Sequence, residues 1–104
     1  MNKVLDKLPA LIEEELQAAM DEHGDFHSFH EGYAVLLEEV EELKEACEGI
    51  EFLLSMVWEN VRNDHEPEIL AFAHKLDRSA QHCAAEAIQV AAMACKLIRF
   101  GEKE

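Results

Sequence analysis

The chain has 104 residues, which is the size of one small domain. Its 23 acidic residues outnumber its 9 basic residues, and the formal net charge is −14 at pH 7. This charge argues against binding to nucleic acid polymers or anionic membranes, because both depend on an excess of Lys and Arg. A hydrophobic fraction of 49% is typical of a folded domain rather than of a disordered acidic tail.

The cysteines and the N-terminal sequence predict the cellular compartment. Cys47, Cys83 and Cys95 form no Cys-x-x-Cys motif, which favours reduced thiols in a cytoplasmic protein. The spacing of Cys83 and Cys95 along an apolar helix is typical of inert core thiols. The N-terminus lacks an apolar signal core, and no stretch approaches the roughly 20 apolar residues of a membrane span.

Apolar residues recur at helical spacing along most of the chain, and strict alternation is nowhere sustained, so an all-α fold is expected. A first helix is predicted over residues 4–20, where Pro9 either marks its start or kinks it. The segment 23–25 contains Gly24, which tolerates the left-handed conformation that ends helices.

A second helix is predicted to begin at Ser28, where Ser28 and Glu31 have the spacing of a capping box. Gly49 weakens this helix near its end, and residues 52–62 are then expected to form a shorter third helix. The polar segment 63–67 is the clearest break in the chain, because it ends in a proline.

The last helix is predicted over residues 69–98, with Gly101 ending it. These four segments predict a single domain over residues 1–104 with the fold of an antiparallel four-helix bundle. Between residues 83 and 98 the last helix is apolar around much of its circumference, which is typical of helices buried between subunits. We therefore expect a homodimer or homotetramer.

The second helix carries an apolar stripe, and carboxylates lie beside it. The stripe consists of Tyr33, Leu36, Val40, Leu43 and Cys47. Glu39 lies at the edge of this stripe and Glu42 lies beside it, three residues apart, which places their Cβ atoms roughly 5–6 Å from each other. Two carboxylates at this separation repel each other unless a cation lies between them, and Mg²⁺ or Mn²⁺ suits such oxygen ligands. A solvated acidic face is the alternative interpretation.

A further carboxylate, Glu86, lies within the least polar region of the chain, residues 84–94. Isolated carboxylates rarely occupy such surroundings without a partner, because removing the charge from water is costly. Gln89 follows three residues later on the same face and adds a carbonyl oxygen. One interpretation is a hydrogen bond or ion pair between helices, and the other is a metal site in which this pair faces Glu39 and Glu42.

These segments also resemble a known family. The string over residues 30–43, with Glu38, Glu39 and Glu42, resembles the E-E-x-x-E motif of the MazG-like all-α NTP pyrophosphohydrolases. Residues 86–94 are similar to the later helix of short phage-type members. The resemblance implies Mg²⁺-dependent cleavage of a nucleoside triphosphate between its α and β phosphates, giving a monophosphate and pyrophosphate, in dimers or tetramers.

By this similarity Glu39, Glu42 and Glu86 are expected to be metal ligands, with Gln89 at the fourth ligand position. A carboxylate near the ion would act as catalytic base, and Glu38 is the candidate. Gln89 stands where the family motif has aspartate, so a diverged member with weak or no activity is an alternative. A non-catalytic helical module for oligomerisation or partner binding is a second alternative, in which the exposed carboxylates serve solubility.

Other residues have simpler interpretations. His23, His27 and His30 have a spacing that would suit a transition metal, but the glycine between them favours a loop or capping role. Trp58 lies in an apolar run and is typical of a core residue. The basic residues that can contact phosphate in or near the bundle are Lys44, Lys75, Arg78, Lys96 and Arg99.

Overall fold

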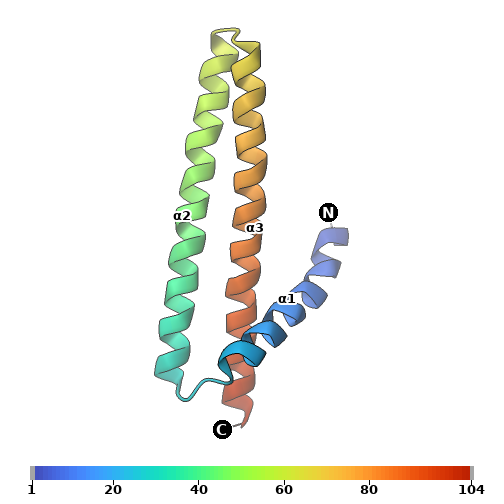
Figure 1. The fold of residues 1–104 in the computed structure, drawn as a ribbon, viewed down its shortest axis with the longest axis vertical. Coiled ribbons are helices and arrows are strands. Elements are labelled where there is room, and N and C mark those ends of the chain that lie inside the picture. The colour runs from blue at the N-terminus through green and yellow to red at the C-terminus, as the bar shows by residue number, and fades with distance from the viewer. Residues whose placement is uncertain (1, 104) are drawn as a thin grey trace. The chain divides into compact units, whose positions relative to one another are not determined.

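A computed structural model describes residues 2–103 of the chain, with side chains described from residue 3. Over this range it has three helices and no strand: α1 (Asn2–His23), α2 (Phe29–Arg62) and α3 (Glu66–Lys103), as Figure 1 shows. The predicted all-α class is confirmed. No helix in the described part of the chain is long and apolar enough to cross a membrane.

The prediction of four helices is wrong, because α2 runs without interruption through Gly49 to Arg62. Gly49 does not adopt the positive φ that ends helices. A glycine in a helix interior costs about 1 kcal/mol relative to alanine. This cost is too small to break α2, because the glutamates, alanine and leucines on either side of Gly49 are good helix formers.

The predicted boundary between α1 and α2 is confirmed. Gly24 has a φ of 71°, and its amide donates to the carbonyl oxygen of Met20 at 2.8 Å. At the start of α2 the amide of Glu31 donates to Oγ of Ser28 at 3.1 Å. The carboxylate of Glu31 in turn accepts a hydrogen bond from the amide of His27 at 3.0 Å, one residue before the usual position for a capping box.

The break between α2 and α3 is also where the sequence predicts it. Asp64 adopts a φ of 54° in the turn, and Pro67 is the second residue of α3, where its missing amide hydrogen costs nothing. The other end of α3 differs from the prediction. The helix passes through Gly101 to Lys103, and a Cβ at Gly101 would lie 3.3 Å from the ring of Phe29.

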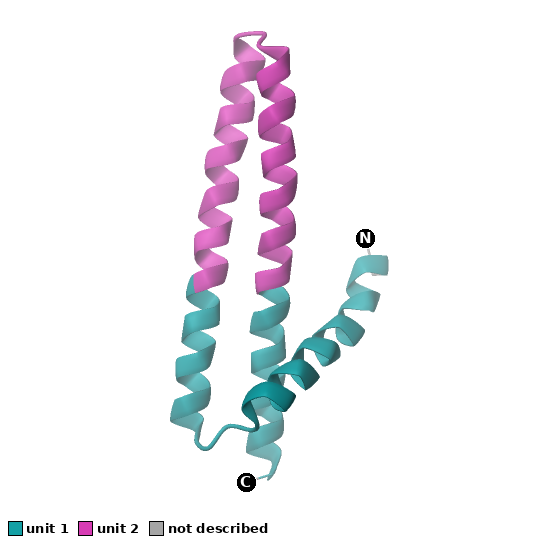
Figure 2. Cartoon of the chain, viewed as in Figure 1, with its two compact units in different colours: residues 1–41, 87–104 teal, residues 42–86 magenta. Residues whose placement is uncertain are grey.

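The chain forms two compact units, coloured separately in Figure 2: unit 1 is residues 1–41 with 87–104, and unit 2 is residues 42–86. Unit 1 contains the buried apolar core, in which α1 packs on the C-terminal part of α3. Phe29 and Phe100 add an edge-to-face contact, with ring centroids 5.2 Å apart. The core residues are Leu16, Phe26, Ala92, Met93 and Phe100.

Gly32 decides which side of α2 faces the interior of unit 1. A Cβ at this buried glycine would lie 2.5 Å from Cδ1 of Leu97 and 3.2 Å from the ring of Phe26. The interior side of α2 therefore passes through Gly32 and the half-buried Glu39, while Tyr33 is 64% exposed. The predicted apolar stripe is confirmed only in part: Leu36 packs against the core and Leu43 is half-buried. Tyr33 and Val40 are exposed, because the small glycine and not the large tyrosine makes the helix contact.

Unit 2 is an antiparallel pair of helical segments joined by the turn at residues 63–65. Among its residues only Asn60 is buried, and its amide donates to the carbonyl oxygen of Met56 at 2.8 Å. Trp58 is 60% exposed, so its predicted place in a core is wrong. A helical pair has only one shared face, and the apolar side chains outside that face stay in contact with water. The large exposed ones are Phe52, Leu54, Trp58, Val61 and Leu70.

Candidate functional site

Two predicted site residues face each other within unit 2. Glu42 on α2 and Glu86 on α3 offer carboxylate oxygens within 4.8 Å of each other. Glu42 is exposed, whereas the side chain of Glu86 is only 17% exposed. Both residues line a pocket of about 450 Å³ within this unit. The remaining lining residues are Glu45, Ala46, Gly49, Ser79 and His82.

The two oxygens of Glu86 have different surroundings. Oε1 lies 3.7 Å from Nε2 of His82, an exposed ring that pairs with a carboxylate only when protonated. Oε2 is buried and has no hydrogen-bond partner among the described residues. A buried acceptor without a donor is costly, and a second carboxylate nearby adds repulsion. The pair formed by Glu42 and Glu86 is therefore suited to a cation.

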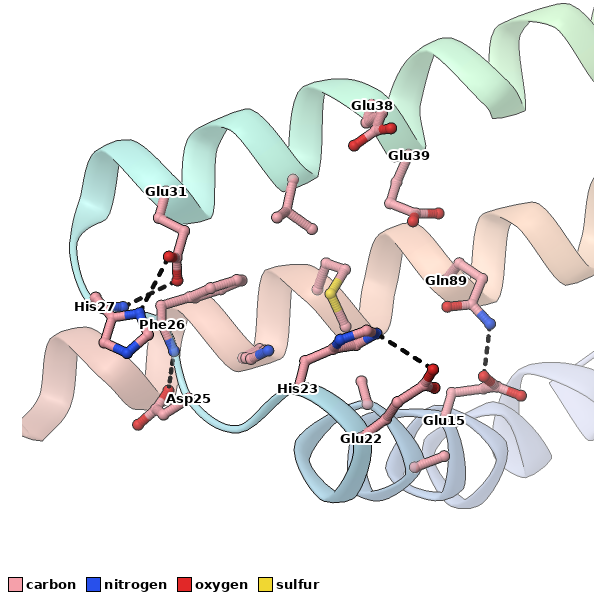
Figure 3. A pocket seen from close by; sticks show the side chains of 15 residues that line it. Glu15, Glu22, His23, Asp25, Phe26, His27, Glu31, Glu38, Glu39 and Gln89 are labelled. Atoms are coloured by element: carbon pink, nitrogen blue, oxygen red, sulfur yellow. Dashed lines mark hydrogen bonds and ion pairs between the residues drawn. The ribbon is translucent and has the colours of Figure 1, made fainter.

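Glu38 and Glu39 lie near the end of the part of α2 that belongs to unit 1. Glu39 precedes Glu42 by three residues on an unbroken helix, so the predicted one-turn spacing of these two carboxylates is present. Glu39 is half-buried and Glu38 is exposed. Both line a pocket of about 580 Å³ that lies within unit 1 (Figure 3).

This unit 1 pocket is mainly acidic, and its basic lining residues are Lys96, His23 and His27. Lys96 is 5% exposed, and its Nζ lies 4.4 Å from the ring centroid of Phe26, a distance suited to a cation–π interaction. Val35 and Met93 contribute apolar side chains to the wall of this pocket. The carboxylates that line the pocket are Glu15, Glu22, Asp25, Glu31, Glu38 and Glu39.

Gln89 also lines the unit 1 pocket, where its amide nitrogen donates to Oε2 of Glu15 at 2.5 Å (Figure 3). The carbonyl oxygen, which is the atom that would bind a metal ion, does not take part in this bond. The role of Gln89 as a ligand remains a prediction. Sequence reasoning missed Glu15 as its partner, because nothing in the pattern of α1 distinguishes this glutamate from the two before it.

Ion pairs within unit 1 hold two other acidic groups. Arg99 donates to both carboxylate oxygens of Glu13, at 3.2 and 2.7 Å, and this pair lowers the pKa of Glu13. Lys103 donates to Oδ2 of Asp25 at 2.9 Å. This bond, and then the amide of Phe26, lower the pKa of Asp25. Arg99 was a candidate phosphate contact, and the structure shows it paired with a carboxylate.

The histidines do not form a metal-binding group within the part of the chain that the structure describes. Nδ1 of His27 lies 3.1 Å from Oε2 of Glu31, and this hydrogen bond is the main cause of the lowered pKa of Glu31. His23 lies 3.8 Å from a carboxylate oxygen of Glu22. These contacts at the start of α2 and the end of α1 fit the predicted loop and capping role.

Comparison of the chain with known protein families, curated proteins and solved structures finds no match.

Proposed function

We propose that the chain is a MazG-like nucleoside triphosphate pyrophosphohydrolase that depends on Mg²⁺ or Mn²⁺. Glu42 and Glu86, with Glu39 from the preceding turn of α2, hold the divalent cation. The observation that carries this proposal is the buried Oε2 of Glu86, which has no hydrogen-bond partner among the described residues and belongs to a carboxylate beside that of Glu42.

The donor set fits the proposed ion. Carboxylate oxygens are the ligands that Mg²⁺ and Mn²⁺ prefer, and no thiol or imidazole is required. A bound dication offsets the repulsion between Glu42 and Glu86 and gives the buried oxygen a partner. Gln89 follows Glu86 by one helical turn and supplies a neutral carbonyl oxygen in addition. Three carboxylates with one amide make a weaker site than four carboxylates, so slow turnover is expected.

The substrate class is the one that the MazG-like resemblance implies, and the charge of the chain makes a bound cation necessary for it. A protein of net charge −14 repels a triphosphate unless cations are localised at the binding site. When bound, the metal ion neutralises phosphate charge. Of the five candidate phosphate contacts, Lys96 is the one that lines the pocket of Glu38 and Glu39, so it is the proposed phosphate contact.

Glu38 is the proposed general base. It takes a proton from water as the water oxygen forms a bond to the α-phosphorus. The bond between that phosphorus and the bridging oxygen breaks, and the bridging oxygen leaves with pyrophosphate. Glu38 is exposed and lines the pocket, so water reaches its carboxylate.

Metal-dependent melting tests the site. The wild type should be stabilised by Mg²⁺ or Mn²⁺, by about 2.7 kcal/mol at a hundredfold excess over the dissociation constant. Glu86→Gln should melt no lower than the wild type in chelator and should gain nothing from the ions. The exposed Glu51 on α2 provides a control, and Glu51→Gln should respond to metal as the wild type does. Equal metal responses of Glu86→Gln and the wild type would contradict the proposal.

Pyrophosphate release tests the chemistry separately. The wild type should release pyrophosphate from at least one nucleoside triphosphate in Mn²⁺ or Mg²⁺. Glu38→Gln should lower the rate about 10²-fold or more while leaving metal-dependent melting unchanged, because a base acts on water and not on the ion. A metal response without any pyrophosphate release would show that the protein binds cations but is not this enzyme, and would refute the enzymatic assignment.

One observation favours a second candidate function, a helical module that associates with a second copy of the chain. Unit 2 leaves five large apolar side chains exposed, Trp58 among them, and pairing with another hairpin would cover them. Trp58 is the single tryptophan, so its emission reports on this surface. Association predicts blue-shifted emission that moves to the red on dilution and a monomer after Trp58→Lys. A monomeric wild type in light scattering excludes this candidate.

A further inference from the structure

Two cysteines face each other in unit 2. The Sγ atoms of Cys47 on α2 and Cys83 on α3 are 3.3 Å apart, and both residues are free thiols. Small residues accompany this contact, since a Cβ at Gly49 would lie 3.7 Å from Oγ of Ser79. The two helical segments therefore approach closely along this stretch, and the thiols are brought together by the packing of the hairpin.

This geometry is close to that of a disulfide, whose sulfur atoms are bonded at about 2.0 Å. We propose that Cys47 and Cys83 are a redox-modification site, which a peroxide oxidises to an intramolecular disulfide that ties α2 to α3 within unit 2. The proposal does not require Glu42 and Glu86 to bind a cation.

The two thiols have different roles in this reaction. Cys47 is exposed, so a peroxide reaches its sulfur directly. Cys83 is half-buried, and its hydrogen bond with Cys47, followed by burial, raises the pKa of its thiol. Because it is the exposed thiol of the pair, Cys47 is the one that reacts first with peroxide, and Cys83 is the thiol that resolves the intermediate.

The atoms balance in two steps. The thiolate sulfur of Cys47 attacks one oxygen of hydrogen peroxide, the O–O bond breaks, and the released hydroxide takes up a proton to become water. The sulfur of Cys83 then attacks the resulting sulfenic sulfur and loses its proton, and hydroxide leaves as a second water. Two thiols are oxidised and one peroxide is reduced to two waters.

The disulfide would have a large effect on unit 2, whose apolar side chains are all at least partly exposed. Cys47 and Cys83 are 36 positions apart in the sequence, so the bond closes a long loop in the unfolded chain. Closing a loop of this length stabilises the folded state in the chain-entropy account. We expect oxidation to raise the melting temperature by on the order of 10 °C.

The experiment uses the full chain, both as the wild type and as Cys95→Ser. After titration with hydrogen peroxide, both proteins should lose the mass of two hydrogen atoms and two titratable thiols. Peptide mapping should find Cys47 joined to Cys83 in a single chain. Cys47→Ser and Cys83→Ser, each with intact helical circular dichroism, should not form this intramolecular bond. A disulfide to Cys95, a disulfide only between chains, or oxidation that stops at separate sulfenic or sulfinic acids would overturn the proposal.

Melting gives the second readout. The oxidised wild type should melt higher than the reduced protein, and dithiothreitol should return it to the lower value. The same peroxide treatment should not raise the melting temperature of Cys47→Ser. A mapped Cys47–Cys83 bond with an unchanged or lower melting temperature would show that the bond does not tie the hairpin together, and would overturn that part of the proposal.

Discussion

Gln89 on α3 donates a hydrogen bond of 2.5 Å to the carboxylate of Glu15 on α1, across 74 positions of sequence. Both residues belong to unit 1 and line its acidic pocket. A neutral amide at position 89 can donate to Glu15, whereas the aspartate of the MazG-like motif would repel it. The identity of residue 89 therefore affects the packing of α1, and it would set the charge of the proposed metal site.

We expect Gln89→Asp to be less stable than the wild type in chelator, by about 1–3 kcal/mol, because a hydrogen bond is replaced by two facing carboxylates. If position 89 is a ligand, the variant should gain more from Mn²⁺ than the wild type does. Thermal melting in chelator and in Mn²⁺ measures both effects. Equal destabilisation with and without Mn²⁺ would show that Gln89 acts only as the partner of Glu15.

A reversed pair provides the control for this prediction. Glu15→Gln combined with Gln89→Asp places an amide opposite a carboxylate again. The double variant should recover most of the stability lost by Gln89→Asp in chelator. The effects of substitutions at two residues in direct contact are not additive, because each changes the partner of the other. Failure to recover would mean that the loss arises from the shorter side chain and not from charge repulsion.

The two glycines of α2 predict opposite effects for the same substitution. Gly32→Ala should destabilise the protein by about 1 kcal/mol or more, because its Cβ would overlap Leu97 and press on the ring of Phe26. Gly49→Ala should stabilise it by about 0.5–1 kcal/mol, since its Cβ would make an ordinary contact with Ser79 and alanine favours the helix. Denaturant unfolding measures both, and effects of the same sign would contradict the packing described here.

Lys103 should stabilise the protein at neutral pH but not in acid. Its hydrogen bond lowers the pKa of Asp25 in the folded state, so the stabilisation is present above the ordinary pKa and disappears as the pH falls through the folded value. Lys103→Gln should therefore melt below the wild type at pH 7, and the two should converge as the pH falls through the lowered pKa of Asp25 in the folded protein. Lys7→Gln on α1 removes the same charge and is the control.

High salt should shrink the same difference, because Lys103 and Asp25 lie at the surface and ions screen their attraction. A difference between Lys103→Gln and the wild type that persists unchanged in acid, once Asp25 is protonated, would show that the lysine acts through its aliphatic chain and not through its charge.

The sequence alone determined the helical class and most of the helix ends. Gly24, the pair Ser28 and Glu31, and Pro67 mark boundaries through local backbone chemistry, which acts over a few residues and can be recognised without the fold. The one-turn spacing of Glu39 and Glu42 is of the same kind, because it follows from helical geometry. The effect of Gly49 was misjudged, since a glycine only weakens a helix and its neighbours decide whether the helix continues.

Only the tertiary structure decided which residues from distant segments meet. The partner of Gln89, the contact between Cys47 and Cys83, and the position of Glu86 beside Glu42 depend on how α3 packs against α1 and α2. The interior side of α2 was also set in this way. Helix packing there depends on a glycine that allows close approach, and a hydrophobic pattern assigns no weight to a missing side chain.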